Sequence, residues 1–130
     1  MGCDIHLYIE KKVRGKWVPF KEIPQNDYPD DRCYDVFALL AGVRGRFDKT
    51  YFPDRGIPED TSYVENRDDD DDYCWLGEHS FTYATIHELK KVKWQKYIDY
   101  ECGFQHFIKK YFPLASSSDK NIRILMGFDS

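Results

Sequence analysis

The sequence predicts an α+β fold in which a small mixed sheet packs against two or three helices, within a single domain of residues 1–130. Residues 3–10 alternate apolar and polar side chains without interruption, which is typical of a half-buried strand. Residues 122–128 show similar alternation near the other end of the chain. Two segments between these strands carry apolar residues at helical spacing, so helices and strands are expected in one core.

The first strand has two faces of different character. Side chains on a strand alternate between faces, so one face carries the apolar residues Cys3, Ile5, Leu7 and Ile9. The other face carries Asp4, His6, Tyr8 and Glu10. Such a row of polar groups is the solvent side of an antiparallel sheet, or a site that can bind a metal or move a proton. Both interpretations stay open at this stage.

A hairpin should follow the first strand. Gly15 centres a turn, and residues 17–20 return as a second strand. Pro19 cannot donate a hydrogen bond to a further strand, so this strand belongs at the sheet edge. Residues 22–31 contain prolines, asparagine and aspartates, which predict a loop.

A core helix is predicted over residues 32–43. Its apolar residues form one broad stripe, and Asp30 or Asp31 stands where a helix cap is favoured. Gly42 supplies the conformation with which many helices end.

Two further segments precede the second half of the chain. Residues 59–66 are expected to form a short helical turn, because Pro58 is favoured at a first helical position. Residues 68–72 are consecutive aspartates, which repel one another. A calcium loop needs spaced ligands and a glycine turn, so we expect an exposed loop without a bound cation.

The second half contains a strand, a capped helix and a longer helix. Residues 80–84 read as a strand, and Thr85 with Glu88 has the spacing of a capping box. Aromatic residues at helical spacing predict a helix over residues 94–112.

The closing strand, residues 122–128, should pair beside the first strand. This pairing would bring Arg123 and Asp129 to the face that carries Asp4, His6 and Glu10.

Composition narrows the function classes. A net charge of −4 and a pI of about 5.5 argue against broad nucleic-acid binding but allow a local basic patch. No apolar run is long enough to span a membrane, and no secretory leader is recognised. The cysteines are widely separated and form no CxxC pair, so we expect reduced thiols in a cytoplasmic protein. They are Cys3, Cys33, Cys74 and Cys102.

Two histidines lie in short polar strands. His6 with Asp4, and His79 beside Ser80, offer nitrogen and oxygen groups. Together Asp4, His6 and His79 would suit a divalent zinc, manganese or iron ion. The alternative is a structural role in which the histidines are held by hydrogen bonds.

Three arginines are candidates for anion recognition, because guanidinium pairs bidentately with phosphate or carboxylate. They are Arg44, Arg55 and Arg123. The alternative is that each forms a structural ion pair with one of the 23 acidic residues. The chain contains no glycine-rich phosphate loop, no H-E-x-x-H and no G-x-S-x-G motif.

The opening sequence MGCDIH resembles a family of small proteins encoded by tailed bacteriophages and prophages. Similar blocks follow along most of the chain, namely RCYDVFALLAGVR at residues 32–44, RGIPEDTS at 55–62, HSFTYATIHEL at 79–89 and RILMGFD at 123–129. Phe81 stands where members often carry a second histidine. The resemblance implies a phage or prophage origin and a role inside a bacterial cell, and it supplies no activity.

Three functions fit these observations. The favoured one is a phage accessory protein that binds a small polar or anionic ligand, such as a nucleotide, through Asp4, His6, Arg44, His79, Ser80 and Arg123. The second is a metal-dependent hydrolase that uses Asp4, His6 and His79 to activate water. The third is an acidic protein that inhibits a bacterial enzyme or defence system. The sequence leaves open whether the protein is an enzyme.

Overall fold

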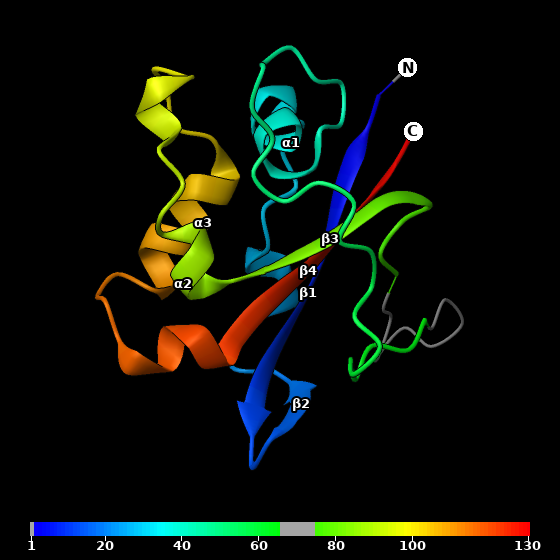
Figure 1. The fold of residues 1–130 in the computed structure, drawn as a ribbon, viewed down its shortest axis with the longest axis vertical. Coiled ribbons are helices and arrows are strands. Elements are labelled where there is room, and N and C mark those ends of the chain that lie inside the picture. Colours follow the sequence, from blue (N-terminus) through cyan, green and yellow to red (C-terminus); the bar gives the residue numbers. More distant parts are fainter. Residues whose placement is uncertain (1, 66–74) are drawn as a thin grey trace.

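The fold is built on a four-stranded sheet with the strand order β2-β1-β4-β3 (Figure 1). A computed structural model describes residues 2–65 and 75–130. The strands are β1 (Asp4–Val13), β2 (Lys16–Pro19), β3 (His79–Thr85) and β4 (Ile122–Asp129). Every described pair of strands is antiparallel. Strand β4 begins beside the end of β1 and runs back to its start. The α+β class is confirmed, with an antiparallel sheet where a mixed one was expected.

Within the described residues, three helices and three 3₁₀ turns accompany the sheet. They are α1 (Tyr34–Ala41), α2 (Ile86–Leu89), α3 (Gly103–Tyr111), η1 (Gln25–Asp27), η2 (Trp94–Lys96) and η3 (Ser117–Asn121). The apolar face of β1 and β4 packs with α1 and α3 in one core that includes Ile9, Phe37, Phe107 and Phe128. None of the helices in the described part of the chain is long and apolar enough to cross a membrane.

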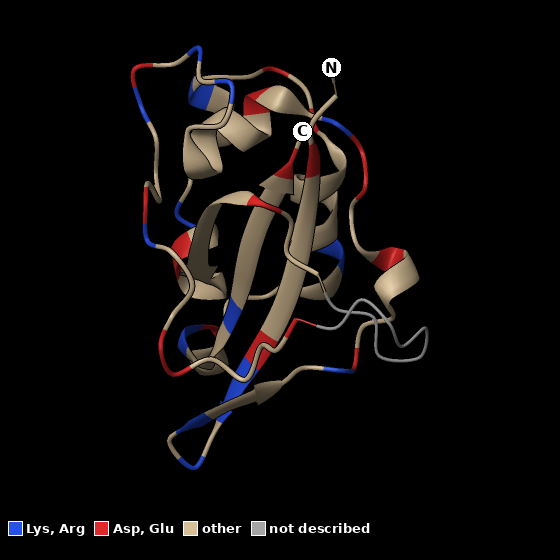
Figure 2. Cartoon of the chain, turned by 90° about the vertical axis from the view of Figure 1, so that its right-hand side faces the viewer, with Lys and Arg blue, Asp and Glu red and all other residues tan. Residues whose placement is uncertain are grey.

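The second face of the sheet carries the polar residues of β1. Figure 2 looks onto this face, which a loop crosses before the chain reaches β3. The pairing of β1 with β4 runs from Asp4 opposite Asp129 to Lys11 opposite Ile122, which confirms the predicted union of the two chain ends. It also places both β1 and β4 inside the sheet rather than at its edges.

Helix α1 is shorter than predicted and lacks the expected aspartate cap. Cys33 is the N-cap residue and its side chain forms no capping hydrogen bond. Asp31 instead accepts a hydrogen bond from the backbone N–H of Gly103 at 3.0 Å, so its carboxylate joins two distant segments. Gly42 ends the helix with φ 77°, as its position predicted.

The helix predicted over residues 94–112 is wrong in its first half. Only η2 forms there, and α3 begins at Gly103. The backbone N–H of Cys102 donates to the Gln105 side chain at 2.6 Å, which fixes a helix start at this point. This local capping contact, rather than the aromatic spacing, sets where the helix begins.

The helical turn predicted for residues 59–66 is reduced to one hydrogen-bonded turn at residues 59–60, where the Thr61 N–H donates to the Pro58 carbonyl at 3.3 Å, and no helix continues through the described residues up to 65. Thr61 and Ser62 instead donate hydrogen bonds to Glu10, and this long-range contact holds the segment open. The aspartate run at residues 68–72 lies outside the described residues.

The capping box predicted at Thr85 is present. Thr85 Oγ1 accepts a hydrogen bond from the Glu88 N–H at 3.1 Å, and the Glu88 side chain accepts one from the Thr85 N–H at 3.0 Å.

Cys33 and Cys102 form a disulfide, so the expectation of reduced thiols is wrong for this pair. Their Cα atoms are 6.3 Å apart although they are separated by 69 positions in the sequence. The bond joins the residue before α1 to the residue before α3, a proximity that only the folded chain creates. Cys3 is a free, buried thiol, and burial raises its pKa. Cys74 lies outside the described residues.

Candidate functional site

Glu10 and Arg123 form a buried ion pair on the second face of the sheet. The side chain of Glu10 is fully buried and that of Arg123 is 5% exposed. Arg123 Nε and Nη2 each lie 3.2 Å from Glu10 Oε1. Thr61 and Ser62 complete the hydrogen bonding of the carboxylate, at 2.7 Å from the Thr61 hydroxyl and 2.8 Å from the Ser62 N–H.

The remaining contacts of Arg123 make this ion pair a structural centre. Its Nη2 donates to Asp60 at 3.0 Å, and its guanidinium carbon lies 4.0 Å from the centre of the Trp17 ring. Since the guanidinium is enclosed by these partners, the arrangement holds the loop at residues 60–62 on the sheet. Arg123 therefore forms a structural ion pair, which the sequence had left open as the alternative to anion recognition.

Asp4 lies at the other end of β1 and pairs with Arg32. Arg32 Nε donates to Asp4 Oδ1 at 2.8 Å, and Nη2 donates to Oδ2 at 3.4 Å. The hydrogen bond from Arg32 lowers the pKa of Asp4, and the same bond raises the pKa of Arg32. Asp4 is therefore an anion that orients an arginine.

His6 shares the face of Asp4 and contacts a different carboxylate. His6 Nε2 lies 3.4 Å from Asp129 Oδ2, and its ring centre lies 4.7 Å from that of Trp75. The expected approach of Asp129 to this face is confirmed.

His79 lies on the opposite face from His6, so the predicted shared site is wrong. His6 pairs with Gly127 and His79 pairs with Phe128, which are consecutive residues of β4 and face opposite sides. The His79 ring stacks on Phe128 at 6.5 Å between ring centres. Its two nitrogens lie 2.9 Å from the Ser80 hydroxyl and 3.0 Å from the Ser130 hydroxyl.

The proposed metal ligands are consequently not brought together. Asp4 and His6 share one face, and His79 belongs to the other. Within residues 2–65 and 75–130, no group of three His, Cys, Asp or Glu side chains is placed to hold a metal ion. Ser80 is exposed and has φ 60°, at the irregular pairing between His79 and Thr82, where a β-bulge bends the strand.

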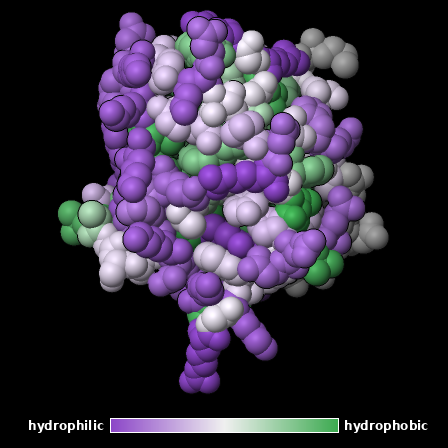
Figure 3. All heavy atoms as spheres, in the orientation of Figure 1, coloured by the Kyte–Doolittle hydropathy of each residue, from purple (hydrophilic) through white to green (hydrophobic). Residues whose placement is uncertain are grey.

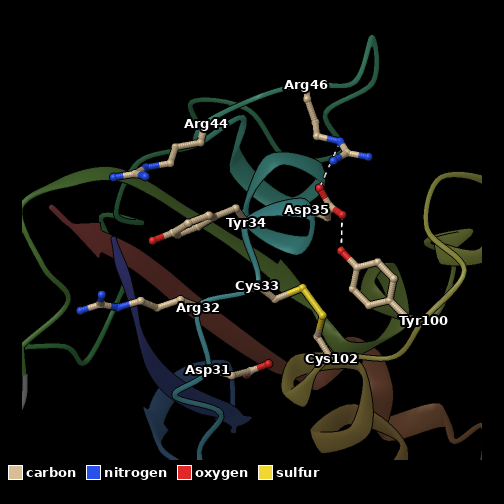
Figure 4. Close-up of a pocket in the computed structure, with 9 residues that line it drawn as sticks. All are labelled: Asp31, Arg32, Cys33, Tyr34, Asp35, Arg44, Arg46, Tyr100 and Cys102. Carbon is tan, nitrogen blue, oxygen red and sulfur yellow. Dashed lines mark hydrogen bonds and ion pairs between the residues drawn. A yellow bond between two sulfur atoms is a disulfide. The ribbon is translucent and has the colours of Figure 1, made fainter. Parts of the chain in front are cut away.

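Arg44 lies in a pocket that the sequence did not predict, near the first turn of α1 (Figure 4). The pocket has a volume of about 620 Å³. We call it the arginine pocket; it is lined by Asp31, Arg32, Cys33, Tyr34, Asp35, Arg44, Arg46, Tyr100 and Cys102. The disulfide forms part of its wall and connects the α1 side to the Tyr100 side.

Two arginines flank Tyr34 in this pocket. The Arg44 guanidinium lies 4.6 Å from the centre of the Tyr34 ring. In Figure 4, the guanidinium groups of Arg44 and Arg32 extend toward the same side as the Tyr34 hydroxyl. This hydroxyl accepts a hydrogen bond from the Cys3 N–H at 3.2 Å, so its own proton can be donated to a ligand.

The backbone after α1 places Arg44 over Tyr34. Gly42 and Arg44 both adopt left-handed conformations, with φ of 77° and 51°. These conformations reverse the chain at the end of the helix. The turn returns Arg44 to the ring of Tyr34, although the two residues are ten positions apart in the sequence.

The other side of the pocket is held by Asp35. Arg46 Nε lies 3.2 Å from Asp35 Oδ1, and the Tyr100 hydroxyl donates to Asp35 Oδ2. The hydrogen bond to Asp35 raises the pKa of Tyr100. Asp35 therefore joins the residues after α1 to those before α3.

Sequence reasoning named Arg44 and missed most of its neighbours. Arg32 and Tyr34 were placed only at the start of the helix predicted over residues 32–43, and Tyr100 only within the helix predicted over residues 94–112. Arg46 was given no role in ligand binding. One signal was available, because three arginines flank a single eight-residue helix. The position of Tyr100 carries no such signal, since it depends on the docking of the segment before α3.

Comparisons of the chain with protein-family models, with curated proteins and with solved structures find no match. The resemblance to phage proteins therefore stays a prediction, and the arginine pocket is the feature of the structure that bears on function.

Proposed function

We propose that this protein binds a small anionic ligand, such as a nucleotide, in the arginine pocket. The observation that carries the proposal is the position of Arg32, Arg44 and Arg46 around one pocket of about 620 Å³. Guanidinium groups recognise phosphate and carboxylate through paired hydrogen bonds. The volume lies within the range of about 300–1,000 Å³ typical of small-ligand pockets.

The proposed binding residues have distinct roles. Arg44 and the Tyr34 hydroxyl are the groups that would contact an anion directly. Arg32 would contribute positive charge while Asp4 fixes its orientation at 2.8 Å. Asp31 and Asp35 also line the pocket, and their negative charges offset part of the positive charge of the arginines. A ligand with one phosphate group therefore matches the charge of the pocket better than a highly charged ligand does.

The phage resemblance supplies the biological setting of this proposal. An accessory protein that binds a nucleotide or another small anion would act inside the infected bacterial cell. Of the residues predicted from the sequence, Arg44 alone lines the arginine pocket, and Asp4 supports it through Arg32.

The test is calorimetric titration of the full chain with inorganic phosphate and with adenosine monophosphate. We expect at least one of them to bind, and Arg44→Gln to weaken that binding by about tenfold or more, since a charge-assisted hydrogen bond contributes about 1.5–3 kcal/mol. Arg14→Gln is the matched control, because Arg14 is exposed in the β1–β2 turn. Absence of binding to both probes, or equal binding by Arg44→Gln, would refute the proposal.

A further inference from the structure

Two basic segments that are distant in the sequence pack against each other beside the arginine pocket. Residues 44–51 follow α1, and residues 90–97 follow α2. The Tyr97 ring lies 5.6 Å from the Phe47 ring and 6.4 Å from the Tyr51 ring, between centres. The backbone N–H of Lys93 donates to the Tyr51 hydroxyl at 3.4 Å. The two segments therefore form one continuous surface.

We call this the basic–aromatic surface; it consists of Phe47, Lys49, Tyr51, Lys93, Lys96 and Tyr97. The three lysines are exposed, and the three aromatic side chains are partly exposed. Figure 3 shows hydrophilic side chains gathered over the upper left of the molecule, where Figure 1 places residues 90–97.

The charge of this surface differs from that of the whole chain. Residues 90–97 contain four lysines and no acidic residue, whereas the chain carries a net charge of −4. Lys49, Lys93 and Lys96 form no ion pair within the part of the chain that the structure describes. Lys90 is paired with Asp119 at 2.8 Å, and residues 44–51 contain one acidic residue, Asp48, so the excess positive charge of this surface rests on Lys49, Lys93 and Lys96.

The lysines are also interleaved with aromatic rings. Lys49 Nζ lies 4.9 Å from the centre of the Tyr51 ring, and Lys96 Nζ lies 5.9 Å from that of Tyr97. Proteins that bind single strands combine such cations, which contact phosphates, with aromatic rings on which bases stack. A duplex keeps its bases stacked on each other and cannot use the rings in this way.

We infer that the basic–aromatic surface binds single-stranded nucleic acid. Lys49, Lys93 and Lys96 contact successive phosphates, and unpaired bases stack on the exposed parts of Tyr51 and Tyr97. This inference goes beyond the proposed function, because none of these five residues lines the arginine pocket. DNA and RNA share the recognised chemistry, and the experiment separates them.

The test measures fluorescence anisotropy of labelled oligodeoxythymidine and oligouridine with the full chain at low salt. We expect at least one strand to bind, and the tighter one identifies DNA or RNA as the ligand. Lys93→Gln/Lys96→Gln should weaken binding about tenfold or more. The slope of log K against log salt concentration should become shallower by about 1.4, because each lost phosphate contact on a single strand contributes about 0.7 to that slope. Lys16→Gln/Lys120→Gln is the control, since both lysines are exposed elsewhere.

A second measurement tests the aromatic contribution without altering the fold. An abasic oligonucleotide keeps the phosphates and lacks the bases, so it should bind more weakly than oligodeoxythymidine. Absence of binding to both strands, equal binding of the abasic strand or of a duplex, or an equal loss in the control variant would overturn the inference. Phosphate binding by Lys93→Gln/Lys96→Gln should stay unchanged, which separates this surface from the arginine pocket.

Discussion

Glu10 and Arg123 are separated by 113 positions and form a buried ion pair between neighbouring strands. The pair connects the first strand of the chain, β1, with the last, β4, on the face of the sheet away from the helices. Through Thr61 and Asp60 it also fixes the loop that crosses this face. One interaction therefore links β1, β4 and the intervening loop.

Breaking this pair should destabilise the fold strongly. Arg123→Met leaves the Glu10 carboxylate buried without its cation, which is expected to cost about 3–5 kcal/mol of unfolding free energy. Urea unfolding followed by circular dichroism measures the loss. In the control, Arg123→Met with Glu10→Leu should recover part of it, because no buried charge is left unpaired. A loss below about 1 kcal/mol for Arg123→Met would show that the pair is not a structural centre.

The outline of the sheet was predictable because it depends on local alternation. The apolar and polar faces of residues 3–10 are visible in the sequence, and the pairing with β4 follows from two half-buried strands at the chain ends. The short α1 and the late start of α3 were not predictable, because Asp31 bonds the backbone of Gly103 instead of capping α1. Such a contact joins segments 72 positions apart.

The candidate site was harder to predict for a related reason. Asp4 and His6 were placed on the correct face, whereas the face of His79 depends on the irregular pairing of β3 with β4. Tyr34 and Arg44 meet because of left-handed conformations at residues 42 and 44. Local patterns predict which face a strand residue occupies, but they do not predict where a reversed loop returns its side chains.

Gly127 in β4 should not tolerate a side chain. A Cβ atom at this position would lie 1.8 Å from the backbone oxygen of Leu76 and 2.8 Å from Phe81. Gly127→Ala therefore forces backbone movement, and we expect a loss of about 3 kcal/mol in unfolding free energy. Gly45→Ala serves as control, because its closest contact would be 3.3 Å and the residue is exposed. Equal thermal melting temperatures for Gly127→Ala and the parent protein would contradict the close approach of the Leu76 backbone to Gly127.

The Cys33–Cys102 disulfide should contribute to stability. It closes a long loop, with 69 positions between its cysteines, and such bonds typically add about 2–4 kcal/mol by restricting the unfolded chain. Dithiothreitol should therefore lower the urea midpoint of the parent protein. Cys33→Ser/Cys102→Ser should start at the lower midpoint and show no further change with reductant. An unchanged parent midpoint after full reduction would rule out this contribution.

Glu88 should make stability depend on acid pH. The hydrogen bond from Arg55, whose Nη2 lies 2.7 Å from Glu88 Oε2, lowers the pKa of Glu88 below its ordinary value of 4.5. The folded state thus favours the carboxylate, so the stabilisation is fully present above pH 4.5 and is lost as the pH falls through the lower, folded-state pKa. Both side chains are about one-third exposed, which limits the effect to about 1 kcal/mol.

The variant Glu88→Gln isolates this charge, because glutamine can still accept the hydrogen bond from the Thr85 N–H in the capping box. At pH 7 the variant should be about 1 kcal/mol less stable than the parent protein, and the difference should shrink as the pH falls below 4.5. Urea unfolding at a series of pH values measures it. Glu59→Gln is the control, since Glu59 is exposed and lies outside this ion pair. A difference that stays constant from pH 7 to pH 3 would mean that glutamine perturbs the cap and that the Arg55–Glu88 charge contributes nothing.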